Sequence, residues 1–183
     1  MSEADLGQLP DAELISRAKR GETECFGQLY ERYVDQIFRY VRTRVADAQD
    51  AEDLTENIFV RSYESLATYE DRGWAYSAFL YQVARNLLVD HYRQTGSEQP
   101  LEASEPLEAA EPGLEQRLTD QEEIVRIKRT MALLPDDYQE IIRLRVLLGL
   151  PTSTAAEWMD RSEGAARVLL HRALKALRQE LET

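Results

Sequence analysis

The clearest pattern along this chain is an apolar stripe between residues 26 and 41. Apolar side chains recur there at intervals of three and four residues, the spacing that places them on one face of an α-helix. The pattern predicts a long helix that faces a core. Its apolar positions are Phe26, Leu29, Tyr30, Tyr33, Val34, Ile37, Phe38 and Val41.

The same helical period recurs on both sides of this stripe. A short helix over 11–20 is predicted to stop at Gly21, and helices over 51–67 and 75–93 follow. A stripe over 124–134 ends before a proline, and a second helix, capped by Asp136 or Asp137, is predicted to run to Leu148 with Gly149 as its stop. Helices over 153–159 and 163–181 complete the chain. No stretch alternates with a period of two, so the fold class predicted is all-α.

An acidic segment separates the two sets of helices. Residues 95–116 contain six acids, no Lys or Arg, and no Val, Ile or aromatic residue, together with Pro100, Pro106 and Pro112. Such a segment cannot bury enough apolar surface to offset the entropy lost on ordering. We therefore predict a flexible acidic linker over 95–116 that joins two small helical domains, 1–94 and 117–183.

Composition argues against several classes of function. The 183 residues carry a formal net charge of −12, with one cysteine, two histidines and no long apolar run. A disulfide framework, a structural zinc site and membrane insertion are therefore not expected, and Cys25 is expected to pack between helices. The N-terminus has no pattern of a secretory signal, which predicts a cytoplasmic protein. No phosphate loop, metal-ligand cluster or nucleophile and base pair is present, so neither an enzyme nor a cofactor is expected.

Basic charge is concentrated in the last predicted helix. Residues 161–178 hold five Lys or Arg and one His against a single acid, although the whole chain is acidic. A basic amphipathic helix by itself is more often a solvated surface. Here a short helix and a tight turn precede it, the arrangement of a helix-turn-helix, whose second helix enters the major groove. Base contacts are predicted for Arg167, Val168 and His171, and phosphate contacts for Arg172, Lys175 and Arg178.

Two other segments have the composition of binding surfaces. A run of acids from Asp47 to Glu56 leads into the first turns of the helix over 51–67. Such a run suits a basic partner, but acids also stabilise the N-terminus of any helix. The loop before the 75–93 helix combines aromatics with arginine, as stacking on unpaired bases requires, although Trp74 could equally close the core. The following helix presents polar groups suited to bases or phosphates: Gln82, Arg85, Asn86 and His91.

Two pairs of motifs carry a family resemblance. DAEDLTENIF (50–59) and FLYQVARNLLVDHYR (79–93) resemble region 2 of the sigma-70 family. LPDDYQEIIRLRVLLGL (134–150) and SEGAARVLLHRALKALRQEL (162–181) are similar to region 4 of its extracytoplasmic-function (ECF) group. The motifs occur in the family's order and cover roughly 11–94 and 120–181. The chain thus resembles a two-domain ECF sigma factor.

This resemblance implies partners and site residues. Region 2 is expected to bind the β′ clamp coiled coil of core RNA polymerase and the melted minus-ten element, with one base flipped into a pocket. Region 4 is expected to bind the β flap and the minus-thirty-five element of promoter DNA. The acidic linker is expected to thread through the polymerase, which performs the chemistry, and an anti-sigma factor is an expected partner. The implied residues are Asp50, Glu52, Asp53, Glu56 and Asn57 for core polymerase, Arg72, Gly73, Trp74, Tyr76, Gln82, Arg85 and Asn86 for the minus-ten element, and Arg161, Arg167, Val168, His171, Arg172 and Lys175 for the minus-thirty-five element.

The helix-turn-helix departs most from the family pattern. From Pro151 to Ala156 the chain lacks the usual Ser-x-x-Glu capping box. We expect the cap to move to Thr154 with Glu157 as its partner, which shortens the helix, and Asp160 to adopt the left-handed turn conformation. Two alternatives stay open: a sigma-like adapter or degenerate paralogue that binds polymerase or a regulator without reading promoters, and a helix-turn-helix regulator that binds duplex DNA without polymerase.

Overall fold

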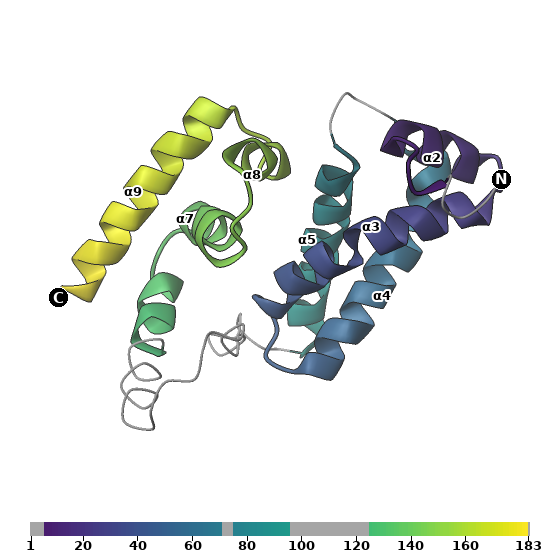
Figure 1. Cartoon of the computed structure of the whole chain (residues 1–183). Helices are drawn as coiled ribbons and strands as arrows, with labels where there is room; N and C mark the ends of the chain where they lie inside the picture. The colour runs from purple at the N-terminus through teal and green to yellow at the C-terminus, as the bar shows by residue number, and fades with distance from the viewer. Residues whose placement is uncertain (1–5, 71–74, 96–124, 183) are drawn as a thin grey trace, which may run out of the picture.

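The computed structural model describes residues 6–70, 75–95 and 125–182. These residues form helices and no strand, which confirms the predicted all-α fold. Residues 125–132 are helical, and the α-helices that carry labels are shown in Figure 1 together with the other elements. In chain order they are α2 (Asp11–Lys19), α3 (Thr23–Arg42), α4 (Ala48–Ser65), η1 (Leu66–Thr68), α5 (Tyr76–Thr95), α7 (Asp136–Ile142), η2 (Arg143–Leu147), α8 (Thr152–Trp158) and α9 (Glu163–Leu181).

Helices α2 to α5 pack around one apolar core. The predicted stripe on α3 faces this core, where Leu29 and Ile37 are completely buried, and α3 packs against α2, α4 and α5. Cys25 is also buried, as expected for a helix-packing residue. Gly21 follows α2 with a φ of 94°, a conformation that residues with a Cβ rarely adopt, so the predicted stop is confirmed.

The first turn of α4 is fixed by a side-chain cap. Asp47 accepts hydrogen bonds from the backbone N–H groups of Gln49 at 2.8 Å and Asp50 at 3.1 Å. An aspartate at this position satisfies donors that have no partner within the helix. The helix therefore begins at Ala48, earlier than the apolar pattern predicted.

The helix predicted from 136 to 148 is two elements. No side chain caps α7, so the predicted cap at Asp136 or Asp137 is wrong. Both residues lie in the first turn, where their charge still suits the positive end of the helix dipole. The chain then widens into the π-helix η2, and the N–H of Leu148 donates to the carbonyl of Arg143 at 2.9 Å. Gly149, with a φ of 64°, ends the element as predicted.

The predicted cap of the next helix is also wrong, because α8 begins at Thr152 and not after Thr154. Pro151 stands at the cap position, and no side-chain hydrogen bond is made there. Its φ of −54° already leads into a helix, and its carbonyl accepts a hydrogen bond from the N–H of Ala155 at 3.0 Å. Ala155 is completely buried, so its N–H needs this partner. Burial thus sets the start of α8 without a capping side chain.

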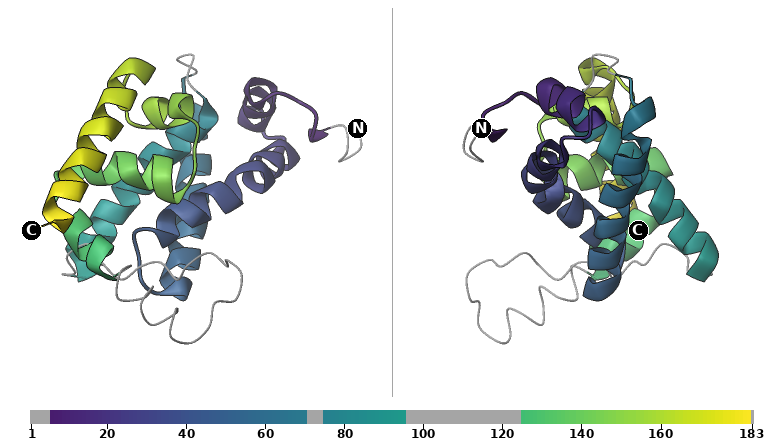
Figure 2. Two further views of the ribbon diagram at one scale, coloured as in Figure 1. Left: turned by 60° about the vertical axis from the view of Figure 1, so that its left-hand side comes forward. Right: turned by 90° about the vertical axis from the view of Figure 1, so that its right-hand side faces the viewer.

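The described helices form two groups that touch. Helices α2 to α5 make one group, residues 125–132 with α7, η2, α8 and α9 make the other, and α8 lies beside α5 (Figures 1 and 2). Of the predicted linker over 95–116, only Thr95 lies within the described residues. The domain boundaries therefore stay predictions, and the hydrophobic pattern contained no sign of the contact between the groups.

Candidate nucleic-acid interface

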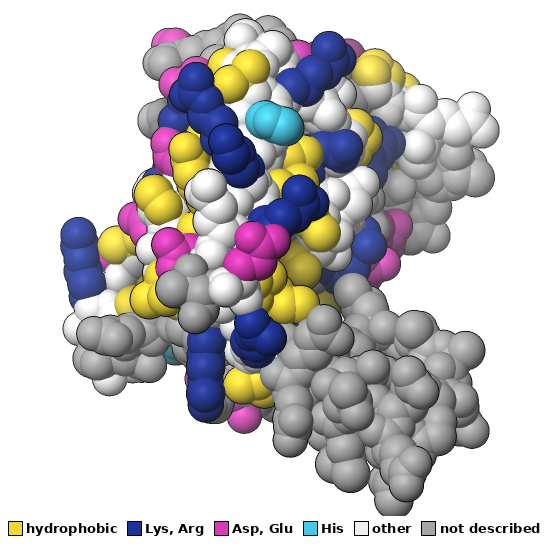
Figure 3. Space-filling model, turned by 90° about the vertical axis from the view of Figure 1, so that its left-hand side faces the viewer, with side chains coloured by type: hydrophobic (Ala, Val, Ile, Leu, Met, Phe, Trp, Pro, Cys, Tyr) yellow, Lys and Arg dark blue, Asp and Glu magenta, His cyan; other side chains and the backbone are white. Residues whose placement is uncertain are grey.

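A row of basic side chains lies along the outer side of α9. Ala166 and Ala173 are completely buried on the opposite side, which confirms the predicted division of this helix into a packing face and a basic face. Dark blue Lys and Arg side chains gather over this helix in Figure 3. The basic face of α9 consists of Arg167, Val168, His171, Arg172, Lys175 and Arg178, all of them exposed.

The turn between α8 and α9 fixes where the basic face begins. Asp160 has a φ of 54°, the left-handed conformation predicted for it. The hydroxyl of Ser162 accepts a hydrogen bond from the N–H of Ala165 at 3.2 Å and caps α9. Arg161 forms an ion pair with Asp137 of α7, so this arginine joins α9 to its own domain. It differs in this respect from the other predicted minus-thirty-five residues, which lie on the basic face of α9.

Acidic side chains cover the outer side of α4. Leu54 and Ile58 are buried on its inner side, and the helix therefore presents its carboxylates to solvent. The amide of Gln49 donates to Asp53 at 3.1 Å, so one carboxylate is oriented by its own helix. The acidic face of α4 consists of Asp50, Glu52, Asp53, Glu56 and Asn57, all exposed. These are the residues predicted to bind core polymerase.

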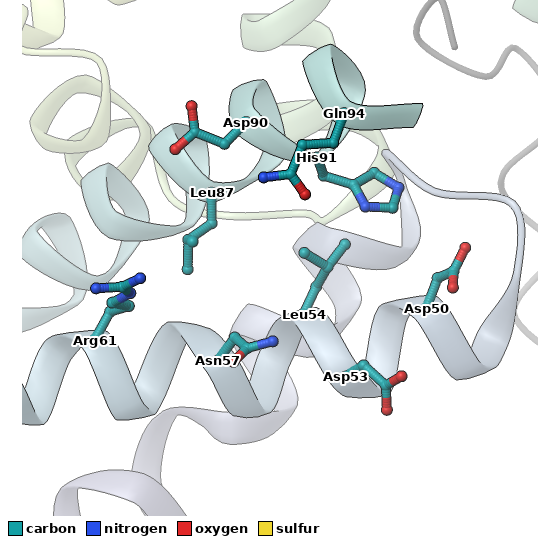
Figure 4. A pocket seen from close by; sticks show the side chains of 9 residues that line it. All are labelled: Asp50, Asp53, Leu54, Asn57, Arg61, Leu87, Asp90, His91 and Gln94. Atoms are coloured by element: carbon teal, nitrogen blue, oxygen red, sulfur yellow. The ribbon is translucent and has the colours of Figure 1, made fainter. Parts of the chain in front are cut away.

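An open pocket of about 360 Å³ lies between α4 and α5, next to the acidic face (Figure 4). Leucines from both helices contribute an apolar part, and three carboxylates outnumber the one arginine at its edge. A pocket with this lining can hold the alkyl stem of a lysine or arginine and pair with its charged head. It is lined by Asp50, Asp53, Leu54, Asn57 and Arg61 of α4 and by Leu87, Asp90, His91 and Gln94 of α5.

The residues predicted to bind the minus-ten element lie in different settings. Tyr76 is only 2% exposed, and its ring packs against Tyr69 and Phe79 with centroids 5.9 and 5.7 Å apart. Burial raises the pKa of its hydroxyl to about 12. Tyr76 is therefore part of an aromatic cluster at the start of α5. Gln82, Arg85 and Asn86 lie exposed on α5, whereas Arg72, Gly73 and Trp74 lie outside the described residues.

A tryptophan that the sequence did not single out joins the two groups of helices. Trp158, the last residue of α8, is completely buried, and its ring stacks on that of Tyr81 with centroids 4.9 Å apart and planes at 24°. Its indole N–H donates to the hydroxyl of Ser77 at 3.2 Å, and its carbonyl accepts from the amide of Gln82 at 3.1 Å. All three partners lie on α5. Trp158 therefore anchors α8 on α5.

A buried carboxylate forms the second part of this contact. Oε1 of Glu140 on α7 accepts hydrogen bonds from the hydroxyls of Tyr40 and Tyr81, each at 2.9 Å. Its Oε2 lies 3.6 Å from Arg44 and 3.2 Å from Arg143. The three charged side chains are 7 to 9% exposed. We call these five residues the Glu140 cluster.

The cluster holds its groups in fixed protonation states. Burial alone pushes the pKa of Glu140 upward, but Arg44, Arg143 and the two tyrosine hydroxyls outweigh it, and the pKa lies below its usual range. Burial and the Glu140 charge raise the pKa of Tyr40 and Tyr81 above that of a free tyrosine. The carboxylate is thus charged and the tyrosines are neutral donors at neutral pH. A signal for this cluster existed in the sequence, since Glu140 directly precedes two isoleucines in an apolar run.

Two features are absent from the part of the chain that the structure describes. None of its helices is both long and apolar enough to cross a membrane. No group of three or more His, Cys, Asp or Glu side chains there is placed to hold a metal ion.

Comparisons with known proteins match both groups of helices. Residues 29–98 match the family model described as Sigma-70 region 2, and residues 124–177 match Sigma-70, region 4. The ECF RNA polymerase sigma factor BldN of Streptomyces coelicolor is 33% identical over 171 residues, covering 90% of this chain and 63% of BldN. The ECF RNA polymerase sigma factor SigD of Mycobacterium tuberculosis is 29% identical over 181 residues, covering 96% of this chain and 85% of SigD.

Solved structures share the fold. CnrH, in complex with the cytosolic domain of CnrY, superposes with a TM-score of 0.64 at 22% identity, covering 94% of this chain and 97% of the solved one. The sigma factor RpoE of Bartonella quintana, in complex with the anti-sigma factor NepR, gives a TM-score of 0.59 at 18% identity, covering 86% of this chain and 97% of that one. With both regions matched in order, the chain belongs to the sigma-70 family of RNA polymerase sigma factors, in its ECF group.

Proposed function

We propose that this chain is an ECF-type sigma factor that binds core RNA polymerase and directs promoter recognition, DNA melting and transcription initiation. The observation that carries the proposal is that one chain presents two surfaces of opposite charge. An acidic face lies on α4 within region 2, and a basic face lies on α9 within a region 4 helix-turn-helix. One surface suits a basic protein partner and the other suits phosphates.

The acidic face of α4 is the proposed contact with the β′ clamp coiled coil. Its carboxylates border the pocket between α4 and α5, where Leu54 and Leu87 supply apolar contact. A basic side chain of the clamp seated in this pocket forms charge-assisted hydrogen bonds with Asp50 and Asp53, which are stronger than bonds between neutral groups. The pocket thus adds fixed geometry to the attraction between the two charged surfaces.

Promoter DNA is assigned to the remaining surfaces. The exposed side chains of Gln82, Arg85 and Asn86 on α5 are proposed to contact the melted minus-ten element together with the 72–74 segment. The basic face of α9 is proposed to read the minus-thirty-five element in the major groove, with its N-terminal residues nearest the bases. Arg161, which is paired with Asp137, has at most a secondary part in this contact.

Membership of the family supports the rest of the proposal. Residues 1–94 form region 2, 95–116 the linker within the polymerase and 117–183 region 4, which also contacts the β flap. Polymerase performs the chemistry, so the chain has no catalytic residues and needs no cofactor or metal of its own. It acts in the cytoplasm, where polymerase is located, and an anti-sigma factor is proposed as its inhibitory partner.

Run-off transcription tests this proposal. The purified chain is mixed with core RNA polymerase and sheared genomic DNA, and the 5′ ends of the transcripts are sequenced. Start sites that share upstream elements and depend on the chain are the expected result. Binding to core without new start sites indicates the adapter, and tight duplex binding without polymerase indicates the regulator; either result contradicts the proposal. Glu56→Lys is expected to weaken core binding, whereas Glu31→Lys, on the exposed side of α3, is the matched control.

A further inference from the structure

The first turn of α9 carries the one acid of the basic helix. Within residues 161–178, Glu163 is the single Asp or Glu, against five Lys or Arg. It is the first residue of α9, directly after the Ser162 cap, and its side chain is exposed. A carboxylate at this end suits the helix dipole. The same end of α9 is proposed to enter the major groove, however, where phosphates repel a carboxylate that has no cationic partner.

The partner of this carboxylate is Arg167, a residue of the basic face of α9. Oε2 of Glu163 accepts a hydrogen bond from Nη2 of Arg167, one turn later, at 3.1 Å. An exposed ion pair between residues four apart adds little to the stability of a helix. The pair therefore matters less for the fold than for the orientation of the guanidinium. The other N–H groups of that guanidinium remain available, and they match the N7 and O6 acceptors of a guanine.

A glycine beside the pair leaves room for a ligand. Gly164 follows Glu163 on the exposed side of the first turn, and a Cβ added there would meet no atom within 4 Å. Its φ lies outside the left-handed region, so the fold does not require glycine at this position. Glycine within a helix is less stable than alanine, but it allows the backbone to approach a ligand closely. The first turn of α9 is therefore suited to close contact with base edges.

We infer that Glu163 is a positioning residue of the minus-thirty-five contact, whose carboxylate holds the Arg167 guanidinium against the major-groove edge of a guanine. The inference rests on the proposed function, because it requires α9 to lie in the groove. An arginine that is held before binding loses less freedom when it forms two hydrogen bonds to a base. Exclusion of water from the groove lowers the effective dielectric constant and strengthens the pair.

Loss of this carboxylate affects specific and non-specific binding in different ways. Without Glu163, the side chain of Arg167 can turn to the nearest phosphate of any sequence, and a repulsive charge is removed. Binding to DNA that lacks the element is then unchanged or tighter. The preference for guanine falls, because a free side chain must now be ordered. If Glu163 only stabilised the helix end, its loss would instead weaken binding to every sequence equally.

The experiment uses holoenzyme formed from core polymerase and the full-length chain. Wild type is compared with Glu163→Gln, Arg167→Ala and the double variant. The control is Glu180→Gln, which removes the same charge about 25 Å farther along α9. The probe is promoter duplex from a start site identified by transcript sequencing, randomised over the minus-thirty-five element with its minus-ten element kept. Bound and free DNA are sequenced, and binding to duplex without either element measures non-specific affinity.

Wild type is expected to prefer guanine at one position by about 5- to 150-fold, and Arg167→Ala is expected to lose this preference. We expect Glu163→Gln to lower it at least about fivefold, the factor that one hydrogen bond ordinarily contributes, without weakening non-specific binding. In the Arg167→Ala background, Glu163→Gln is expected to change no base preference. Glu180→Gln is expected to bind with the base preferences of wild type.

Three results overturn the inference. The first is an unchanged guanine preference in Glu163→Gln, and the second is an equal loss of affinity for every sequence in that variant. The third is a wild-type holoenzyme that starts transcripts without any guanine preference that depends on Arg167. Failure of the proposed function is a different result, because the wild-type holoenzyme then starts no transcripts at all.

Discussion

The Glu140 cluster yields a quantitative prediction about domain docking. Replacing Glu140 with glutamine keeps the shape and one acceptor oxygen, but it removes the charge that lies between two arginines. Arg44 and Arg143 then face each other in a buried site without the carboxylate. Replacing Tyr81 with phenylalanine removes a single hydroxyl that donates to that carboxylate at 2.9 Å.

The expected magnitudes follow from burial. Breaking a buried ion pair by removing one partner costs about 3–5 kcal/mol, and the side chains here are exposed by less than a tenth. Loss of one hydrogen bond to a charged acceptor costs about 1.5–3 kcal/mol. Since about 1.4 kcal/mol changes an equilibrium tenfold, Glu140→Gln is expected to raise the open population about 100-fold or more, and Tyr81→Phe about 10- to 100-fold.

Hydrogen exchange of the Trp158 indole N–H measures this opening. In the docked chain the group is buried and donates to Ser77, so it exchanges only when the domains separate. The exchange rate, followed by NMR, is expected to rise in both variants by the factors given above. Tyr63→Phe, which removes an exposed hydroxyl on α4, is the control and is expected to leave the rate unchanged.

Two results would refute the reasoning. An unchanged Trp158 exchange rate in Glu140→Gln means that the buried charges contribute nothing to docking. Equal acceleration of the backbone amides in the middle of α9 means that the carboxylate stabilises the region 4 fold itself, because separation of intact domains leaves α9 folded.

Three further predictions test other parts of the structure. Arg172→Ala on α9 is expected to lower by about one the slope of the logarithm of the binding constant against the logarithm of the salt concentration, for holoenzyme on promoter duplex. Arg20→Ala, directly after α2, is the control and is expected to leave this slope unchanged. Filter binding at several salt concentrations measures both. Asp160→Gly is expected to raise the stability to thermal unfolding by up to about 1 kcal/mol, because glycine adopts the φ of 54° without steric cost; an equal or lower melting temperature contradicts this. The stability of the docked state is expected to be constant between about pH 6 and 9. Burial raises the tyrosine pKa values of the Glu140 cluster, so the docked state is stabilised below the free-tyrosine pKa of about 10 and loses this stability as the pH rises above it. The pKa of Glu140 is lowered, so its contribution is present above the free-glutamate pKa of about 4.3 and is lost as the pH falls below it. The radius of gyration, measured by small-angle X-ray scattering across the pH range, checks both limits.

Local structure was largely predictable from the order of residues. The period of apolar side chains located α3, α5 and α9, because a helix with one buried face must place apolar residues every three or four positions. Gly21, Gly149 and Asp160 marked turns because few residue types adopt a positive φ. The two faces of α9 followed from the same periodicity. Because one side of the helix is charged and the other is rich in leucine, only the apolar side can pack against the domain.

Helix starts were predicted less well. The expected caps at Asp136 or Asp137 and at Thr154 assumed that a side chain must satisfy the first N–H groups of each helix. In both cases a proline carbonyl accepts the first helical bond, and burial of the following residues holds the turn. A cap contributes about 1 kcal/mol, and the packing of a buried turn readily outweighs that contribution.

The docking of the two domains was decided by tertiary structure alone. Trp158, Tyr81 and Glu140 are separated by up to 77 residues in the chain, and nothing in their local patterns pairs them. Periodicity reports only which side of a helix is buried, and not which distant helix covers it. The sequence by itself therefore determined the helices, their charged faces and the family, whereas the three-dimensional packing determined that a buried carboxylate and an indole hold region 4 against region 2.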